Sequence, residues 1–384
     1  MPEPIADAPA SEVPLRAALA GRRVLLTGHT GFKGAWLALW LNRLGAEVTG
    51  IALPPLTGPG IFRAVRLDEL IDHRIGDIRW PQSFDGALGE LDADLLIHMA
   101  AQALVRPSYA EPVDTYLTNV VGTAVVLDAA RRMPSLRAAI VVTSDKCYEN
   151  REWLWAYRES DALGGSDPYS SSKACAELVT QAYRRSFFCG RGAPAIATVR
   201  AGNVFGGGDW AVDRIIPDIM RAAAAGKPVS IRNPRSTRPW QHVLEPLHGY
   251  LLLAARMLEQ GQAFEGAWNF GPAPDQVADV ETLARHIVEA WGDGAPELLL
   301  GDAPAGPHEA TQLRLDSSKA RTHLGWTPRL PLEEACRMTA EWYRAHHHRS
   351  ADLRVLSEAQ IDRYLGGSLD AATTTPRLRA LQCV

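Results

Sequence analysis

The sequence predicts an α/β fold built around a doubly wound parallel sheet. Short apolar, β-branched segments alternate with longer segments of helical period, which is the pattern of buried parallel strands covered by helices on both faces. A glycine-rich turn directly follows the first apolar segment. The chain has 384 residues, of which 46% are hydrophobic and 22% charged, and this suits one large unit with a smaller second domain.

The individual strands and helices follow from these two periods. We expect strands at residues 24–26, 47–51, 95–99, 138–143 and 195–199. We expect helices at residues 33–44, 115–132, 169–187 and 332–345. In the third of these helices an apolar face recurs at Leu178, Val179, Ala182 and Phe187. Residues 1–20 are rich in Ala, Pro and acidic groups without a clear period, so we expect a mobile leader.

Charge and cysteine usage exclude several classes of function. A net charge of -4 argues against nucleic acid as a partner. The sequence shows neither an apolar run of about 18 residues nor a basic region followed by an apolar stretch, so we expect no membrane span, no signal peptide and a cytoplasmic location. The five cysteines have no CxxC spacing, which disfavours disulfides and zinc. The histidines at 346–348 read as a solvated helix end, and no metal is predicted.

Residues 27–34 form a Thr-Gly-His-Thr-Gly-Phe-Lys-Gly turn between the first strand and the first helix. Glycines in this context let backbone N–H groups at the helix N-terminus approach a pyrophosphate, as in a Rossmann-type dinucleotide site. The predicted cofactor contacts here are Gly28, Thr30, Gly31, Phe32, Lys33 and Gly34. The alternative is a plain strand-to-helix turn.

The second strand does not decide between NAD and NADP. Residues 49–53 read Thr-Gly-Ile-Ala-Leu and offer no carboxylate for the adenosine ribose and no arginine for a 2′-phosphate. Asp77 and Ile78 follow a short expected strand and are candidate contacts to the adenine. Asp77 fits a simple turn equally well.

Two polar segments are expected at the carboxyl edge of the sheet. Tyr169 and Lys173 lie four apart at the start of a helix, so both project from one face, and an ammonium there should lower the pKa of the phenol. Ser144, Asp145 and Lys146 follow the fourth strand. Together with the glycine turn, the Tyr-Lys pair predicts hydride transfer to and from a hydroxyl-bearing carbon. The alternatives are a chance helical pair and a polar loop with a local ion pair.

Residues 22–345 resemble the extended short-chain dehydrogenase/reductases and, within them, the nucleotide-sugar 4,6-dehydratases. The resemblance rests on residues 28–34, 144–150, 200–204, 206–210 and 237–242. Most of these dehydratases carry Asp-Glu where this chain has Asp145-Lys146, and lysine is typical of the branch that acts on CDP-glucose. The resemblance therefore implies bound NAD, CDP-glucose as the small-molecule substrate and a lyase that releases water.

The family's chemistry assigns a role to each polar residue. Tyr169 removes the proton of the sugar 4-hydroxyl, which Ser144 orients, while Lys173 holds the nicotinamide ribose. Lys146 then acts as the base at carbon 5, and Asp145 as the acid that protonates the departing 6-hydroxyl. These roles require a neutral Lys146 and a protonated Asp145, which a dry pocket would favour.

Further residues are assigned by the same resemblance. Ala100 and Ala101 pass beside the cofactor, with His98 as either a neighbour of the site or a buried strand end, and Asn119 as structural support. Candidate substrate contacts lie on three loops, at Asn203, Arg238, His308 and Glu309, with Arg232 and Arg235 as alternatives to Arg238. The family's helix-to-helix contact implies a homodimer or tetramer through the helices around Thr115 and Tyr169. An epimerase, a reductase and a cofactor-sensing module without turnover remain alternatives.

The predicted domains follow from these motifs and from the Gly-, Pro-, Arg- and Trp-rich loops beyond Phe205. A dinucleotide-binding Rossmann domain is expected at 21–204 and 243–294. A smaller nucleotide-sugar-binding domain is expected at 205–242 and 295–350. Residues 351–384 are expected to form a peripheral tail.

Overall fold

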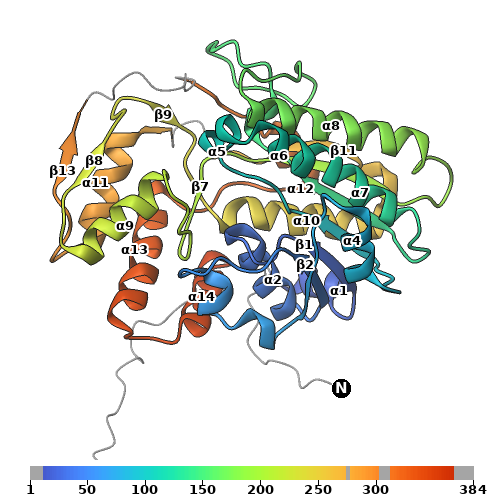
Figure 1. Ribbon diagram of the computed structural model, residues 1–384, viewed down its shortest axis with the longest axis horizontal. Coiled ribbons are helices and arrows are strands. Elements are labelled where there is room, and N and C mark those ends of the chain that lie inside the picture. Colours follow the sequence, from blue (N-terminus) through green and yellow to red (C-terminus); the bar gives the residue numbers. More distant parts are fainter. Residues whose placement is uncertain (1–11, 274–276, 302–311, 367–384) are drawn as a thin grey trace, which may run out of the picture.

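A parallel sheet of seven strands forms the centre of the molecule (Figure 1). The computed structural model describes residues 12–273, 277–301 and 312–366. The sheet order is β11-β6-β5-β4-β1-β2-β3, which places β1 and β4 side by side where the order reverses. The strands are β1 (Arg23–Thr27), β2 (Glu47–Ala52), β3 (Asp72–Ile75), β4 (Leu95–His98), β5 (Ala138–Val142), β6 (Ala195–Arg200) and β11 (Gly266–Asn269). The predicted doubly wound fold is confirmed, and the reversal marks the carboxyl-edge crevice where such folds bind ligands.

Helices cover both faces of the sheet because successive strand residues point to opposite sides. Val24 and Leu26 of β1 join one apolar core, whereas Leu25 joins the other. The first core is covered by α1 (Val13–Leu19), α2 (Phe32–Arg43) and α10 (Leu244–Gln260). The second core is covered by α4 (Pro81–Leu88), α7 (Gly122–Ala130) and α8 (Pro168–Ser186). Both faces are therefore closed to water, as the apolar strands predict.

A smaller body stands beyond the carboxyl edge of the sheet, at the left of Figure 1. It contains α9 (Ile215–Ala225), β8 (Val229–Ile231), α11 (Val280–Trp291), β13 (Leu298–Leu300) and α13 (Leu332–His348). Strand β8 pairs in parallel with β13. Helix α11 packs against α9 and α13, so it belongs to this body, although the sequence grouped it with the larger domain.

Short strand pairs join the two parts. Strand β7 (Val204–Phe205) pairs with β10 (Gln241–His242), and β9 (Thr237–Arg238) pairs with β12 (Ala278–Asp279). The remaining helices are α3 (Ile61–Ala64), α5 (Val105–Ala110), α6 (Pro112–Tyr116), α12 (Ser318–Leu324) and α14 (Leu353–Tyr364). The helix expected at 115–132 comprises α6 and α7 joined by a π-helical turn at Leu117–Val121.

Both expected peripheral segments contain ordered, packed helix. Helix α1 falls inside the expected leader, yet Leu15 and Leu19 are buried and Glu12 pairs with Arg43 at 3.2 Å. Helix α14 falls inside the expected tail, yet the hydroxyl of Tyr364 donates to Glu245 at 2.9 Å. At Val13–Leu19 and Leu353–Tyr364 the structure therefore differs from these expectations, because each helix is short or weakly amphipathic and is stabilised by packing against α2 and α10. Residues 1–11 and 367–384 lie outside the described part.

The expected apolar face of α8 is only partly in the core, because Val179 packs against the second core whereas the other expected positions are exposed. Leu178 is 53% exposed and Phe187 49% exposed. The buried face instead carries polar groups, among them Tyr169, Lys173 and Glu177. The ionisable side chains of α8 that could take part in a reaction therefore face the interior. None of the helices in the described part of the chain has the length and apolar character of a membrane span.

Candidate active site

The glycine turn is shaped for an anionic group. Gly28 has a φ of +79°, and a Cβ there would stand 2.6 Å from the backbone nitrogen of Ala100. A Cβ on Gly34 would stand 2.1 Å from the carbonyl oxygen of Gly28. Helix α2 starts after Gly31 without a side-chain cap, which leaves the positive end of the helix to a ligand. These features fit the pyrophosphate of a dinucleotide, and Phe32 and Lys33 sit in the first turn of the helix.

Hydrogen bonds between the ends of β1 and β4 fix the backbone next to the glycine turn. The Thr27 hydroxyl accepts hydrogen bonds from the backbone N–H groups of Met99 and Ala100, both at 3.1 Å, and contacts His98 Nδ1 at 2.7 Å. His98 is buried and also contacts the Thr123 hydroxyl at 3.2 Å, so it is a structural strand end. Ala101, beside Ala100, is half-buried at the same edge.

Two other predicted cofactor residues make local contacts. The Thr30 hydroxyl donates to the carbonyl of Leu53 at 3.0 Å, which ties the turn to the end of β2. Asp77 accepts the backbone N–H of Arg79 at 2.9 Å and pairs with its guanidinium at 2.6 Å. Ile78 is buried. The side chain of Asp77 is therefore engaged in a turn, the second of the two interpretations that the sequence left open.

Tyr169 and Lys173 lie buried on the inner face of α8. Asp167 caps the helix through the backbone N–H of Ser170 at 2.9 Å, and the Lys173 ammonium donates to the carbonyl of Val142 at 3.2 Å. Burial raises the pKa of Tyr169 to about 12 and lowers the pKa of Lys173 to about 8. The expected lowering of the tyrosine pKa by Lys173 is therefore wrong for the protein alone, because loss of hydration outweighs the favourable interactions of the phenolate.

Asn119 fixes α8 against the loop after β4. Its amide donates to the Ser172 hydroxyl at 2.8 Å and to the carbonyl of Gln102 at 3.0 Å, and its oxygen accepts the Gln102 N–H at 2.9 Å. Ser172 directly precedes Lys173. Asn119 therefore has a structural role, because it holds α8 beside Lys173 against the loop after β4.

Ser144, Asp145 and Lys146 begin a tight turn immediately after β5. The Ser144 hydroxyl donates to Asp145 Oδ1 at 3.0 Å and accepts the Lys146 N–H at 3.2 Å. Asp145 is 2% exposed, and its Oδ2 has no hydrogen-bond partner among the described residues. Burial raises the pKa of Asp145, which favours the protonated acid. Lys146 is half-buried beside it.

A buried ion pair holds this turn in place. Arg200 of β6 pairs with Glu177 of α8 at 2.8 Å, with side chains 3% and 4% exposed. Arg200 also donates to the Tyr148 hydroxyl at 2.7 Å, and that hydroxyl donates to Asn269 at 2.7 Å. The turn is thus tied to three separate elements of the fold.

The sequence assigned no role to Tyr250, Arg214 or Gly202, which the structure brings to the site. The Lys33 ammonium donates to the Tyr250 hydroxyl of α10 at 3.1 Å, and burial lowers the pKa of Lys33 to about 7. Arg214 pairs with Asp209 at 2.8 Å and favours the phenolate of Tyr169. Gly202 after β6 leaves room for Asp145, because a Cβ there would stand 1.8 Å from Asp145 Oδ2. No sequence motif marks these residues, and only their contacts in the folded protein show that they belong to the site.

The predicted substrate residues are partly described. Asn203 lies in the left-handed region with a φ of 49°, next to Gly202. Arg238 is half-buried on β9 and acts electrostatically on Asp145, which places its charge near the acid. Arg232 instead pairs with Asp213 at 3.1 Å, and Arg235 is exposed. His308 and Glu309 lie outside the described residues.

The triple histidine does not form a metal site in the described structure. His346 stacks on Trp342 with ring centroids 5.7 Å apart, whereas His347 and His348 are exposed. Within residues 12–273, 277–301 and 312–366, no group of three or more His, Cys, Asp or Glu side chains is arranged to hold a metal ion.

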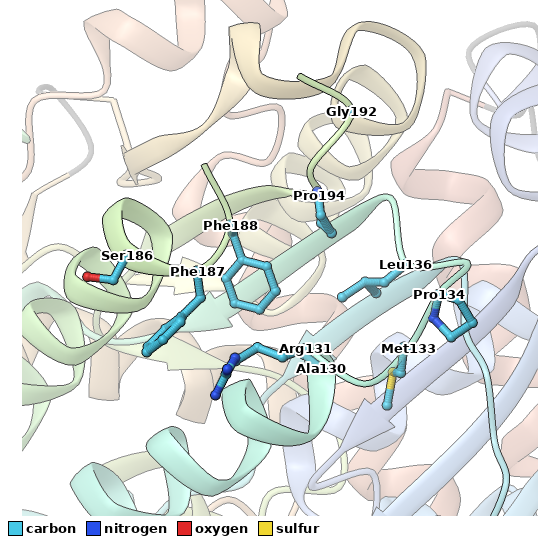
Figure 2. A pocket seen from close by; sticks show the side chains of 10 residues that line it. All are labelled: Ala130, Arg131, Met133, Pro134, Leu136, Ser186, Phe187, Phe188, Gly192 and Pro194. Atoms are coloured by element: carbon cyan, nitrogen blue, oxygen red, sulfur yellow. The ribbon is translucent and has the colours of Figure 1, made fainter. Parts of the chain in front are cut away.

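A hollow of about 440 Å³ lies at the opposite edge of the sheet (Figure 2). Its lining includes Arg131 after α7, Phe187 after α8 and Pro194 before β6. Arg131 stacks over the Phe187 ring at 4.0 Å. This hollow is at the amino ends of β5 and β6, remote from Tyr169, and takes no part in the site.

The parallel sheet, its glycine turn and the buried Tyr-Lys pair at its carboxyl edge define a dinucleotide-dependent enzyme of the extended short-chain dehydrogenase/reductase type. The chain belongs to the GDP-mannose 4,6-dehydratase family, whose model matches residues 25–339. A Salmonella typhimurium protein named CDP-glucose 4,6-dehydratase is 48% identical over 91% of this chain and 97% of its own length. A mouse dTDP-D-glucose 4,6-dehydratase is 27% identical over 85% of this chain and 90% of its own length.

Solved structures share the fold. An epimerase from Methanothermobacter thermautotrophicus superposes with a TM-score of 0.74 at 22% identity, covering 91% of this chain and 99% of its own. The dTDP-glucose 4,6-dehydratase of Streptomyces venezuelae, solved with NAD, gives a TM-score of 0.71 at 22% identity, covering 86% and 99%. At these identities the likeness establishes the fold alone.

Proposed function

We propose that this protein converts CDP-glucose to CDP-4-keto-6-deoxyglucose and water, with NAD as a cofactor that is regenerated in each turnover. The 48% identical relative carries the corresponding name, and structural neighbours were solved with NAD. The observation that carries the proposal is Asp145, a fully buried carboxyl with a raised pKa beside Lys146. Simple hydride exchange needs no such acid, whereas elimination of water does.

The first step removes hydrogen from carbon 4 of the sugar. Tyr169, as phenolate, takes the proton of the 4-hydroxyl, and Ser144 orients that hydroxyl. The residues of the glycine turn would hold the pyrophosphate of NAD, and Lys173 its nicotinamide ribose. When bound, NAD would supply a hydride acceptor for carbon 4 and the hydride donor for carbon 6. Arg214 assists Tyr169 because its charge favours the phenolate.

The second step eliminates water across carbons 5 and 6. The new ketone acidifies the hydrogen at carbon 5, Lys146 removes it, and Asp145 protonates the 6-hydroxyl as it leaves. Burial raises the pKa of Asp145, which favours the protonated form that this step requires. Asp145→Asn should therefore stop at the oxidised sugar with reduced nicotinamide, and Lys146→Ala should lose water elimination. Normal elimination in Lys146→Ala would remove that residue from the role.

Product analysis tests the proposed function. The purified protein should convert CDP-glucose to a product with the strong alkaline absorbance of a 4-keto-6-deoxy sugar, without accumulating reduced nicotinamide. Incubation with UDP-, dTDP- and GDP-glucose in parallel tests the base, because Arg238 and Asn203 do not by themselves select cytosine. A 4-epimer or a reduced sugar as the only product would favour the epimerase or reductase and overturn the proposal.

The proposal includes a homodimer or tetramer and a cytoplasmic location. Exposed apolar side chains gather on the helices that the sequence assigned to subunit contact, including Val113, Tyr116, Val121 and Leu178. The Tyr116 hydroxyl donates to Ser171 at 3.1 Å, so these helices lie side by side in one protomer.

The described cysteines carry free thiols, in keeping with a reducing compartment. Sedimentation velocity tests the oligomer, and a monomer at micromolar concentration would contradict it.

A further inference from the structure

One carboxylate joins two arginines across the boundary between the larger and the smaller body. Asp213 lies in the turn before α9, and its Oδ1 accepts a hydrogen bond from Arg106 at 3.3 Å and another from Arg232 at 3.1 Å. Arg106 belongs to α5 of the larger body, which faces the smaller body in Figure 1, and Arg232 directly follows β8 of the smaller body. This bridge therefore lies on the side of the sheet where doubly wound folds bind their ligands.

The bridge also lies near the proposed reaction centre. The Ser108 hydroxyl of α5 accepts the backbone N–H of Tyr169 at 3.2 Å, and α5 packs against α8. Arg106 precedes Ser108 by two residues on the same short helix. In a nucleotide-sugar the diphosphate is bonded to carbon 1 of the sugar, so a sugar placed at Tyr169 brings its diphosphate into this neighbourhood.

We infer that Arg106 and Arg232 bind the diphosphate of the substrate, and that Asp213 occupies their binding position until the substrate displaces it. The identity of the substrate rests on the proposed function. Two guanidinium groups around one carboxylate leave a positive charge without a counter-charge. A diphosphate in a nucleotide-sugar carries one negative charge on each phosphate and offers each arginine its own set of oxygens, so it matches the two arginines better than Asp213 does.

The bridge is weak enough for a substrate to displace it. The side chains are 41% exposed at Arg106, 45% at Asp213 and 40% at Arg232, so water competes for each ion pair. Each arginine makes a single hydrogen bond to the same oxygen. The neighbouring pair of Arg214 and Asp209, at 2.8 Å, differs because its carboxyl is only 6% exposed. The buried pair belongs to the frame of the site, whereas the exposed bridge can open.

Calorimetric titration with CDP, with NAD present, tests the displacement without turnover. CDP carries the diphosphate and the base but has no sugar that could react. Asp213→Asn removes the charge, and asparagine, like aspartate, tolerates the left-handed φ of 61° at this position. The matched control is Asp128→Asn, which removes an exposed carboxylate paired with Arg131 at 2.6 Å near the opposite edge of the sheet.

D213N should bind CDP about 3- to 10-fold more tightly than the wild type, because two exposed ion pairs no longer have to be broken. The KM for CDP-glucose should fall in the same proportion. Arg106→Ala and Arg232→Ala should each weaken CDP binding by about 10-fold, since each removes a charge-assisted contact to phosphate. D128N should bind CDP as the wild type does.

A bridge with only a structural role predicts the opposite sign for D213N, because a loosened boundary would weaken binding. Unchanged or weaker CDP binding in D213N, equal tightening in D128N, or wild-type affinity in both arginine variants would overturn the inference. Absence of CDP binding in every variant would overturn it as well. If the binding pattern holds but the wild type forms no 4-keto-6-deoxy product from CDP-glucose, the proposed function fails, whereas the diphosphate site is supported.

Discussion

Gly202→Ala should disable the acid of the elimination while leaving the fold intact. The added Cβ would lie 1.8 Å from Asp145 Oδ2, and ordinary van der Waals contact begins at 3.4 Å, so the carboxyl must move by at least 1.6 Å. Displacement of a catalytic group by about 1 Å costs roughly 100-fold in rate, so we expect a loss of at least about 100-fold in kcat. Overpacking should lower the free energy of unfolding by about 1–3 kcal/mol.

The assay is product formation from CDP-glucose together with thermal unfolding. Because the displaced group is the proposed acid of the elimination and has no proposed part in the oxidation, reduced nicotinamide should accumulate in G202A but not in the wild type. Gly86→Ala is the matched control, since Gly86 is exposed in α4 and a Cβ there would meet no atom within 4 Å. This control should keep full activity and gain up to about 1 kcal/mol of stability.

A double-mutant cycle isolates the contact between the two residues. In an Asp145→Ala background the carboxyl is gone, so Gly202→Ala should cost clearly less stability than in the wild type. Wild-type kcat in G202A, or an equal stability cost in both backgrounds, would refute the packing on which this reasoning depends.

Three further perturbations test other parts of the site. Glu177→Gln leaves Arg200 buried without its partner and should cost about 3–5 kcal/mol in chemical unfolding, whereas Glu149→Gln, at an exposed ion pair, should cost less than about 1 kcal/mol. Equal costs would contradict the buried pair. Arg238→Ala should raise KM for CDP-glucose far more than it lowers kcat, and an unchanged KM would count against the contact. Between pH 7 and 10.5 the Lys33 side chain is largely neutral in the folded protein and charged in the unfolded protein, so the unfolded state binds more protons. The free energy of unfolding of the wild type should therefore rise with pH in this range, relative to that of Lys33→Met. Parallel stability curves for the two proteins would show that Lys33 is not desolvated.

The central sheet was predictable because its signal is local. Each strand is a short apolar run, and the glycine turn and Tyr169-Lys173 pair are short motifs whose meaning depends only on the order of elements. Strand β11 was missed because Gly266–Asn269 is only four residues long and contains a glycine. Helix α14 was missed because its buried positions include the polar residues Ser357 and Gln360, so the sequence shows no apolar face that would predict a buried helix.

The electrostatics of the site were only partly predictable from the sequence. The spacing of Tyr169 and Lys173 predicts a lowered pKa of the phenol, but burial supplies a larger effect of opposite sign. The approach of Gly202 to Asp145, and of Tyr250 to Lys33, joins residues far apart in the chain. The raised pKa of Asp145 was correctly expected, because a carboxyl at the end of a buried strand loses hydration whichever neighbours surround it.

Deuterium placed at carbon 4 of CDP-glucose tests the central claim most directly. If Tyr169 and the bound nicotinamide move hydrogen within one sugar, the label should be recovered at carbon 6 of CDP-4-keto-6-deoxyglucose in a single enzyme turnover, with no net change in the cofactor. Label retained at carbon 4, or a deoxysugar whose carbon 6 carries only hydrogen from other sources, would contradict the account.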